Sequence, residues 1–248
     1  MKLDAPHGDD KAGGTTILVA VAHPDDEVLG AGGTIARLAR SGSTVHVLYL
    51  TDGTSARGSD HAAARRRETA ARRAAEILGA EPPQFLRFPD NRLDSVPLLE
   101  VIHAVESVVR EVAPSTIYTH HAGDLNVDHS ICLRAVLTAC RALPGSLVKR
   151  IYAIEIPSST EWAPPGANSA FVPSRFIDIT ESLPTKLAAL EAYAEEMRPF
   201  PHPRSAAAVE ALARFRGASA GLEAAEAFVV LREIIGGDLS GLLAKELG

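Results

Sequence analysis

Short apolar runs alternate along the chain with longer segments in which apolar residues recur every three or four positions. The short runs predict buried strands, and the longer segments predict helices. In the first half of the chain the two alternate regularly, which indicates βαβ units and a parallel sheet. The expected strands span 16–21, 44–50, 84–88, 116–119 and 150–156. The expected helices span about 32–41, a segment that ends at Leu78, 97–112, and a segment that starts near Asp128.

After the fifth strand the pattern becomes mostly helical. We expect a long loop over 157–175, which contains four prolines, and then helices over 183–197, 205–216 and 222–235 with a short tail helix. Residues 1–14 are polar and Gly-rich without an apolar core, which predicts a flexible leader rather than a secretory signal. The predicted fold class is α/β: a Rossmann-like three-layer sandwich with a mostly parallel sheet, a helical C-terminal part, and a single domain over 15–248.

The composition and charge exclude several classes of protein. The chain is 46% hydrophobic and 23% charged, as is usual for a soluble globular protein. No stretch approaches the ~20 apolar residues of a membrane span, and the net charge of −6 argues against a nucleic-acid or membrane-surface binder. Two cysteines make no disulfide framework. We therefore expect a cytoplasmic protein that acts on a small molecule.

Ionisable groups crowd the end of the first expected strand. His23, Asp25, Asp26 and Glu27 follow it directly. Holding them together is costly unless a cation neutralises the carboxylates. Because histidine and carboxylate form a zinc-type ligand set, a divalent metal is the simplest such cation. The other expected strand ends on this rim carry polar side chains that are candidates to line a substrate pocket: Asp52, Asp90, Asn91, His120 and His121.

A zinc site of this kind needs a third protein ligand and an open position for water. The best supplier is the segment after the strand 116–119, where His129 stands near a helix start. Asp128 or Asp124 would then fix the tautomer of an imidazole ligand. The alternative is that His129 is an ordinary residue of the first helical turn, with Asp128 as the N-cap.

The motifs resemble those of a known family. Ala22 to Glu27 after an apolar strand, followed by Gly30, Gly32 and Gly33, resembles the N-terminal signature of the PIG-L/LmbE-like zinc N-deacetylases. Later motifs match in the family's order, so the resemblance covers about 15–228. They are Thr51-Asp52-Gly53, Leu78-Gly79, Pro89-Asp90, Gly123 to His129, Tyr193 to Ser205, Ala224, and Glu226 to Phe228.

The resemblance implies a division of roles. His23, Asp26 and His129 would bind Zn²⁺ (or another divalent ion), and Asp25 would be the general base. The enzyme would remove the N-acetyl group of an amino sugar or glycoconjugate, and it would form a homo-oligomer. These roles agree with the chemistry, since one of two adjacent carboxylates can bind the ion while the other moves protons.

The chain departs from many family members at one position. Where they carry a second histidine three residues before the last ligand, this chain has Asn126, which can donate a hydrogen bond to an oxyanion but cannot act as a general acid. We expect His202, between Pro201 and Pro203, to supply the missing group, because some members contribute a histidine late in the chain. The alternative is a loop histidine at a subunit contact.

Other interpretations remain open. A dinucleotide-binding oxidoreductase would use Gly30, Gly32 and Asp52, but Ile35 stands at the third glycine position of that fingerprint. A non-catalytic carbohydrate-binding protein is a third class. Trp162 can stack on a sugar ring or form a subunit contact. A run of arginines can bind a phosphate or form a solvated helix face, and we favour the solvated face. The run consists of Arg65, Arg66, Arg67, Arg72 and Arg73.

Overall fold

The computed structural model describes residues 14–54, 61–164, 166 and 170–235. The predicted leader lies outside these residues except for Gly14, and so does the predicted tail helix. Among the helices that are described, none has both the length and the apolar character needed to cross a membrane.

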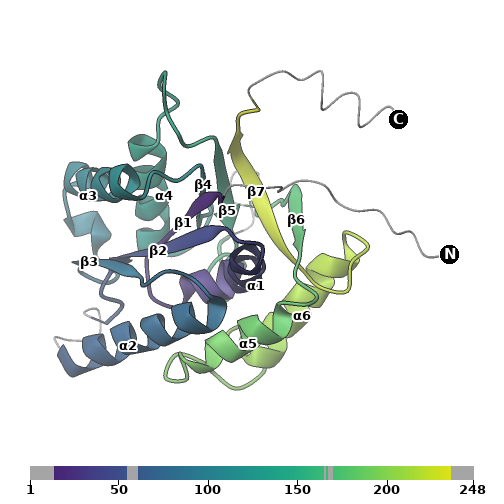
Figure 1. The fold of residues 1–248 in the computed structure, drawn as a ribbon. Coiled ribbons are helices and arrows are strands. Elements are labelled where there is room, and N and C mark those ends of the chain that lie inside the picture. Colours follow the sequence, from purple (N-terminus) through teal and green to yellow (C-terminus); the bar gives the residue numbers. More distant parts are fainter. Residues whose placement is uncertain (1–13, 55–60, 165, 167–169, 236–248) are drawn as a thin grey trace, which may run out of the picture.

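The described strands form one seven-stranded sheet in the order β3-β2-β1-β4-β5-β7-β6 (Figure 1). Strands β1 to β5 run parallel to one another, and β7 pairs antiparallel with both β5 and β6. The mostly parallel sheet is therefore confirmed. The strands are β1 (Thr16–Val21), β2 (Thr44–Thr51), β3 (Gln84–Phe88), β4 (Thr116–His120), β5 (Arg150–Ile154), β6 (Arg175–Asp178) and β7 (Ala225–Glu233).

Helices cover both faces of the sheet (Figure 1). Alternate residues of β1 point to opposite faces: Val19 joins the core under α1, α2, α5 and α6, whereas Leu18 joins the core under α3 and α4. This is the predicted three-layer α/β sandwich. The helices are α1 (Asp26–Arg40), α2 (His61–Leu78), α3 (Leu98–Val112), α4 (Val127–Ala139), α5 (Leu183–Glu191) and α6 (Ala206–Ala218), with a 3-10 turn η2 (Leu93–Ser95).

The prediction of a helix over 222–235 is wrong. This segment forms β7, which inserts between β5 and β6, and β6 itself was not predicted. The alanines, glutamates and leucine of the segment favour a helix by intrinsic propensity. Long-range pairing with β5 and burial of Phe228 outweigh that preference. The helix predicted over 183–197 is also shorter, since α5 ends at Glu191.

Helix α1 begins at Asp26, six residues before the predicted start at Gly32. Its glycines therefore lie inside the helix, at positions where neighbouring side chains leave no space for a Cβ. A Cβ on Gly30 would lie 2.8 Å from Ile154, and one on Gly33 would lie 2.8 Å from Ile179. The strand-to-helix turn that a dinucleotide-binding protein builds from these glycines is therefore absent from this part of the chain.

The topology places one pair of strand ends at the point where the strand order reverses. Strands β1 and β4 are parallel neighbours, and the chain continues from β1 to β2 on one side and from β4 to β5 on the other. Ligands of open α/β sheets bind at such a switch point, beside the carboxyl ends of the strands. His23 follows β1, and the segment that leads to His129 follows β4.

Candidate metal centre and active site

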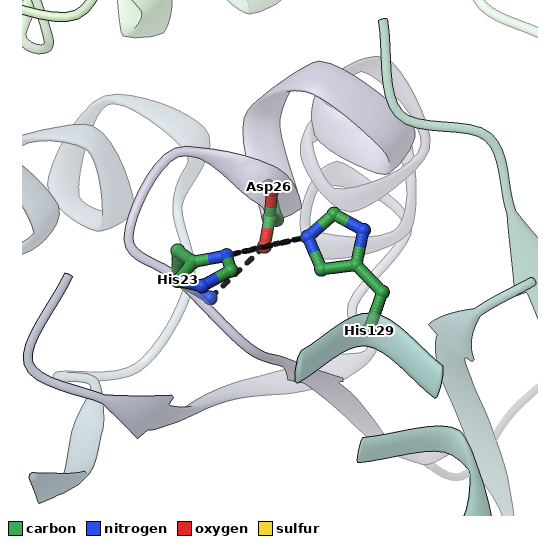
Figure 2. A group of neighbouring side chains, drawn as sticks. All are labelled: His23, Asp26 and His129. Carbon is green, nitrogen blue, oxygen red and sulfur yellow. Dashed lines mark hydrogen bonds and ion pairs between the residues drawn. The ribbon is translucent and has the colours of Figure 1, made fainter. Parts of the chain in front are cut away.

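Three buried side chains direct ligand atoms at one another (Figure 2). The Nδ1 atom of His23 lies 3.1 Å from Oδ2 of Asp26 and 3.2 Å from Nε2 of His129, and the latter two atoms are 3.3 Å apart. His23 comes from the loop after β1, Asp26 is the first residue of α1, and His129 lies in the first turn of α4. Residues separated by more than one hundred positions thus meet at one point.

The geometry of these atoms suits a metal ion. Tetrahedral ligands about 2.0–2.1 Å from a zinc ion lie about 3.3 Å from one another, close to the three distances observed. The other oxygen of Asp26, Oδ1, is buried and has no hydrogen-bond partner among the described residues. The two imidazole nitrogens and Oδ2 of Asp26 thus form a donor set that fits a divalent cation, and a cation would also offset the cost of burying the unpartnered Oδ1.

The Nε2 side of His23 faces two further carboxylates. It lies 3.1 Å from Asp128 and 3.2 Å from Asp90. Burial alone lowers the pKa of His23, but its hydrogen bonds to Asp128 and Asp26 outweigh that effect and raise the pKa well above its usual range. Asp128 also accepts the backbone N–H groups of Asn91 and Leu93, at 2.6 and 3.0 Å. It is therefore a fixed acceptor that orients the imidazole.

Asp124 plays the same part for His129. Its Oδ1 lies 2.9 Å from Nδ1 of His129. The carboxylate is itself held by the hydroxyls of Ser159 and Thr160, from the loop after β5. Burial alone raises the pKa of Asp124, but the hydrogen bond to His129 outweighs it and lowers the pKa. Asp124 and Asp128, the two neighbours indicated by the sequence, thus each contact an imidazole of the cluster formed by His23, Asp26 and His129, which we call the metal group.

Asp25 lies in the chain between His23 and Asp26, and its backbone conformation is unusual. Its backbone has a φ of 121°, a region that L-residues rarely adopt, and its side chain is buried. Its Oδ2 accepts a hydrogen bond from Nη1 of Arg204 at 2.9 Å, and Arg67 lies 3.9 Å away. Oδ1 is buried and has no partner among the described residues.

The sequence interpretation missed both of these arginines as site residues. The sequence favoured a solvated helix face for the arginine run of α2, and the other four arginines of the run are exposed, but Arg67 itself is buried. Arg204 lies within the matched segment 193–205, in which the sequence indicated His202 as the candidate site residue. The signal for Arg204 was its place in that segment, two residues after a proline-flanked histidine.

The interpretation of Asp128 as the N-cap of the helix is wrong. The cap of α4 is Asn126, whose side-chain oxygen accepts the N–H of Asp128 at 2.8 Å. The amide nitrogen of Asn126 donates to Asn91 at 3.1 Å. Both ends of this amide are thus engaged within the protein, on loops that border the metal group.

His120 is a packing residue beneath the site. It is fully buried, its Nε2 accepts the N–H of Ala22 at 2.8 Å, and its ring stacks on His129 at 3.8 Å between centroids. Burial lowers the pKa of His120 to about 3, so the ring is neutral. His121 is buried as well and contacts the ring of Phe171 edge-on at 5.3 Å.

Trp162 and His202 meet at the rim although forty residues separate them. Their ring centroids are 5.7 Å apart in an edge-on arrangement, and Trp162 is half exposed. The loop after β5 and the segment before α6 therefore come together here. His202 accepts the backbone N–H of Arg204 through Nδ1 at 3.1 Å. Asp52 lies after β2 and caps its own turn by accepting the N–H of Thr54 at 2.9 Å.

Known proteins resemble this chain over most of its length. It is 35% identical over 181 residues to an uncharacterised deacetylase of Escherichia coli (strain K12), YaiS, with coverage of 71% of this chain and 88% of the relative. It is 30% identical to the diacetylchitobiose deacetylase of Thermococcus kodakarensis, over 77% of this chain and 72% of that protein. The crystal structure of a conserved protein from Thermus thermophilus, TT1542, superposes with a TM-score of 0.71 and 28% identity, and covers 91% of this chain and 99% of that one.

One relative carries a different activity in its name. The 4-oxalmesaconate hydratase of Pseudomonas putida is 31% identical over 205 residues, which cover 71% of this chain and 72% of the relative. Proteins of this similarity therefore include at least one that is named for a reaction other than deacetylation.

The model of the family described as "PIG-L: GlcNAc-PI de-N-acetylase" matches residues 18–140. This range runs from β1 to the end of α4 and contains all three residues of the metal group. The relatives extend the similarity beyond it, over about three quarters of the chain. The chain therefore belongs to the PIG-L family, as its motifs predicted.

Proposed function

We propose that this protein is a zinc-dependent hydrolase that removes the N-acetyl group of an amino sugar or glycoconjugate. The observation that carries the proposal is the convergence of His23, Asp26 and His129 within 3.3 Å, with the buried carboxylate of Asp25 beside them in the chain. The family and the two deacetylase relatives support the same reaction type.

A zinc ion held by the three ligands would supply a Lewis acid that lowers the pKa of water and polarises the amide carbonyl. Asp25 performs the proton transfers in this proposal. Its Oδ1 accepts the proton of the water that attacks the acetamide carbon, and the carboxyl group then returns this proton to the leaving amine. The C–N bond breaks to give the free amine and acetic acid, which keeps the second hydrogen of the water and ionises to acetate on release, and Asp25 ends the cycle ionised.

Asp124 and Asp128 orient the two imidazoles in this proposal, since each hydrogen-bonds the ring nitrogen that faces away from the metal group. Asn126 and His202 were the candidates for a second catalytic group. The amide of Asn126 is engaged as an N-cap and with Asn91, so Asn126 supports the loop. His202 remains the candidate to donate to the substrate, together with Trp162 as a wall for the sugar ring.

The test is an amine-release assay with N-acetylglucosamine, N,N'-diacetylchitobiose and N-acetylglucosaminyl-inositol. We expect the zinc-loaded protein to release amine and acetate in equal amounts. Removal of the metal by a chelator should abolish the activity, and added Zn²⁺ should restore it. Asp25→Asn should lower kcat about 10²–10⁴-fold with the metal content unchanged, and the exposed Asp94→Asn should match the wild type.

The same assay separates the competing functions. A hydratase adds water to a carbon–carbon double bond and releases no amine. A carbohydrate-binding protein without catalysis would bind the sugar and leave it intact, with or without Asp25. Sugar binding without amine release, or amine release that survives Asp25→Asn, contradicts the proposal.

A further inference from the structure

Arg204 makes the shortest contact of any cation with the carboxylate of Asp25 among the described residues. Its Nη1 donates to Oδ2 of Asp25 at 2.9 Å, across 179 positions of sequence. The carboxylate side chain is 3% exposed and that of Arg204 is 21% exposed, so water screens the contact little. The charge of Asp25 raises the pKa of the Arg204 guanidinium.

The second cation near Asp25 is committed elsewhere. Arg67 forms an ion pair with Glu196 at 2.5 Å, and it lies 3.9 Å from the same oxygen, Oδ2, of Asp25. Both arginines therefore approach one oxygen of the carboxylate. The other oxygen, Oδ1, is left buried and unpartnered within the described part of the chain. A carboxylate held in this way presents a single free oxygen in a fixed direction.

The position of Arg204 is itself determined by its surroundings. Its Nε donates to the hydroxyl of Ser158 at 2.7 Å, and its backbone N–H donates to His202 at 3.1 Å. The next residue, Ser205, caps helix α6. The guanidinium is thus fixed between the loop after β5 and the start of α6, and it does not depend on the metal group for its placement.

We propose that Arg204 is a positioning residue for the hydrolysis: it fixes Oδ2 of Asp25 so that Oδ1 is the oxygen that takes the proton from water. The inference rests on the proposed function, because it assumes that Asp25 is the base. Within the described residues, Arg204 acts through Asp25 and forms no hydrogen bond or ion pair with the three metal ligands. Loss of Arg204 should therefore slow the reaction without weakening substrate or metal binding.

The experiment compares Arg204→Ala, Arg204→Gln and Arg204→Lys with the wild type in the amine-release assay, on the N-acetyl sugar that the wild type turns over. Misplacement of a reacting group by about 1 Å costs about 10²-fold in rate. We expect Arg204→Ala and Arg204→Gln to lose about this factor in kcat, with KM within about twofold and zinc content unchanged. Arg204→Lys should lie between them and the wild type, because it keeps the charge but loses the fork that also reaches Ser158.

A small-molecule rescue separates positioning from a merely structural role. Guanidinium chloride at low millimolar concentration should raise the kcat of Arg204→Ala, whereas equal sodium chloride or urea should not. The matched control is Arg198→Ala, an exposed arginine of the same segment that donates only to the backbone carbonyls of Glu195 and Met197 among the described residues. It should keep the activity of the wild type. If Arg204→Ala does not fold, Arg204→Gln decides by its kcat.

Three results overturn the inference while leaving the proposed function intact: a wild-type kcat in Arg204→Ala or Arg204→Gln, a loss confined to KM, or an absence of guanidinium rescue in a folded, zinc-loaded Arg204→Ala. Release of no amine by the wild type overturns the proposed function, and the inference with it.

Discussion

At the scale of single residues, Glu27 fixes the loop that carries Asp25, the proposed base. It is fully buried, its Oε2 accepts the backbone N–H of Asp25 at 3.0 Å, and Tyr193 donates to its Oε1 at 2.7 Å. Tyr193 in turn contacts the hydroxyl of Tyr49 at 3.2 Å. This buried chain of polar groups stabilises the positive-φ backbone conformation of Asp25 through its N–H group. The site thus depends on a carboxyl group that takes no direct part in it.

Burial raises the pKa of Glu27 from its usual 4.5 to about 7. The folded protein binds the carboxyl proton of Glu27 more tightly than the unfolded chain does. Protonation of Glu27 therefore stabilises the fold fully below about pH 4.5, and this stabilisation is lost as the pH rises through about 7. Glu27→Gln carries no ionisable proton. The quantity of interest is therefore the free energy of unfolding of the wild type minus that of Glu27→Gln. We expect this difference to fall by at most about 3 kcal/mol between pH 5 and 8.5, since one pKa unit corresponds to about 1.4 kcal/mol.

Urea unfolding at several pH values measures this difference, and the metal ligands common to both proteins cancel in it. Glu210→Gln is the control, because this partly exposed carboxylate pairs only with Arg214 among the described residues. A difference between the wild type and Glu27→Gln that stays flat over the range contradicts the expectation.

The sequence predicted the residues of the metal group better than their surroundings. His23, Asp25 and Asp26 follow an apolar strand, and a motif of that kind is local, so it can be found without a structure. Arg204 reaches Asp25 only because the segment before α6 folds back over the strand ends. No periodicity or spacing encodes that contact, which spans most of the chain.

At the scale of elements, a buried ion pair ties β7 to the middle of α1. Glu226 of β7 accepts the N–H groups of Gly33 and Thr34 at 2.9 and 2.7 Å. Lys186 of α5 lies 2.6 Å from Glu226 and donates to the carbonyl of Leu29 at 2.9 Å. Two elements, β7 and α5, are thus joined to α1, the helix that begins at the proposed metal ligand Asp26. The wrong prediction of a helix over 222–235 did not indicate the contact between Glu226 and α1, because Glu226 reaches α1 as part of strand β7.

Glu226→Ala should therefore be strongly destabilising. It leaves the buried ammonium of Lys186 without its carboxylate and two backbone N–H groups without their acceptor. Breaking a buried ion pair by removal of one partner costs about 3–5 kcal/mol. Urea unfolding should show this loss, and Lys186→Met in the Glu226→Ala background should recover part of it. The exposed pair of Glu210 should lose less than about 1 kcal/mol on Glu210→Ala. Equal losses at the two sites would exclude the role given to the buried pair.

At the scale of the whole molecule, the regular first half was predictable and the second half was not. Strands β1 to β5 are parallel to one another, and all but β3 are mostly buried, so each is recognisable as a short apolar run between helices. Strand β6 is an edge strand, β7 lies between β5 and β6, and most residues of the two strands are half-buried. Their partners are set by long-range pairing, which a local pattern does not contain. The site draws on both halves, because its ligands come from the first and Arg204 from the second.

This assembly predicts that zinc stabilises the whole fold. The ligands join the end of β1 and the start of α1 to α4, and the unfolded chain does not hold them together. A ligand at about 100 times its Kd stabilises by about 2.7 kcal/mol, which raises Tm by about 5–10 °C in a protein of this size. Scanning calorimetry of the chelator-stripped protein in buffered free Zn²⁺ measures the shift. His129→Ala should lose most of it, and the exposed His103→Ala on α3 should keep it. If His129→Ala keeps the full shift, zinc binds elsewhere and the three residues do not form its site.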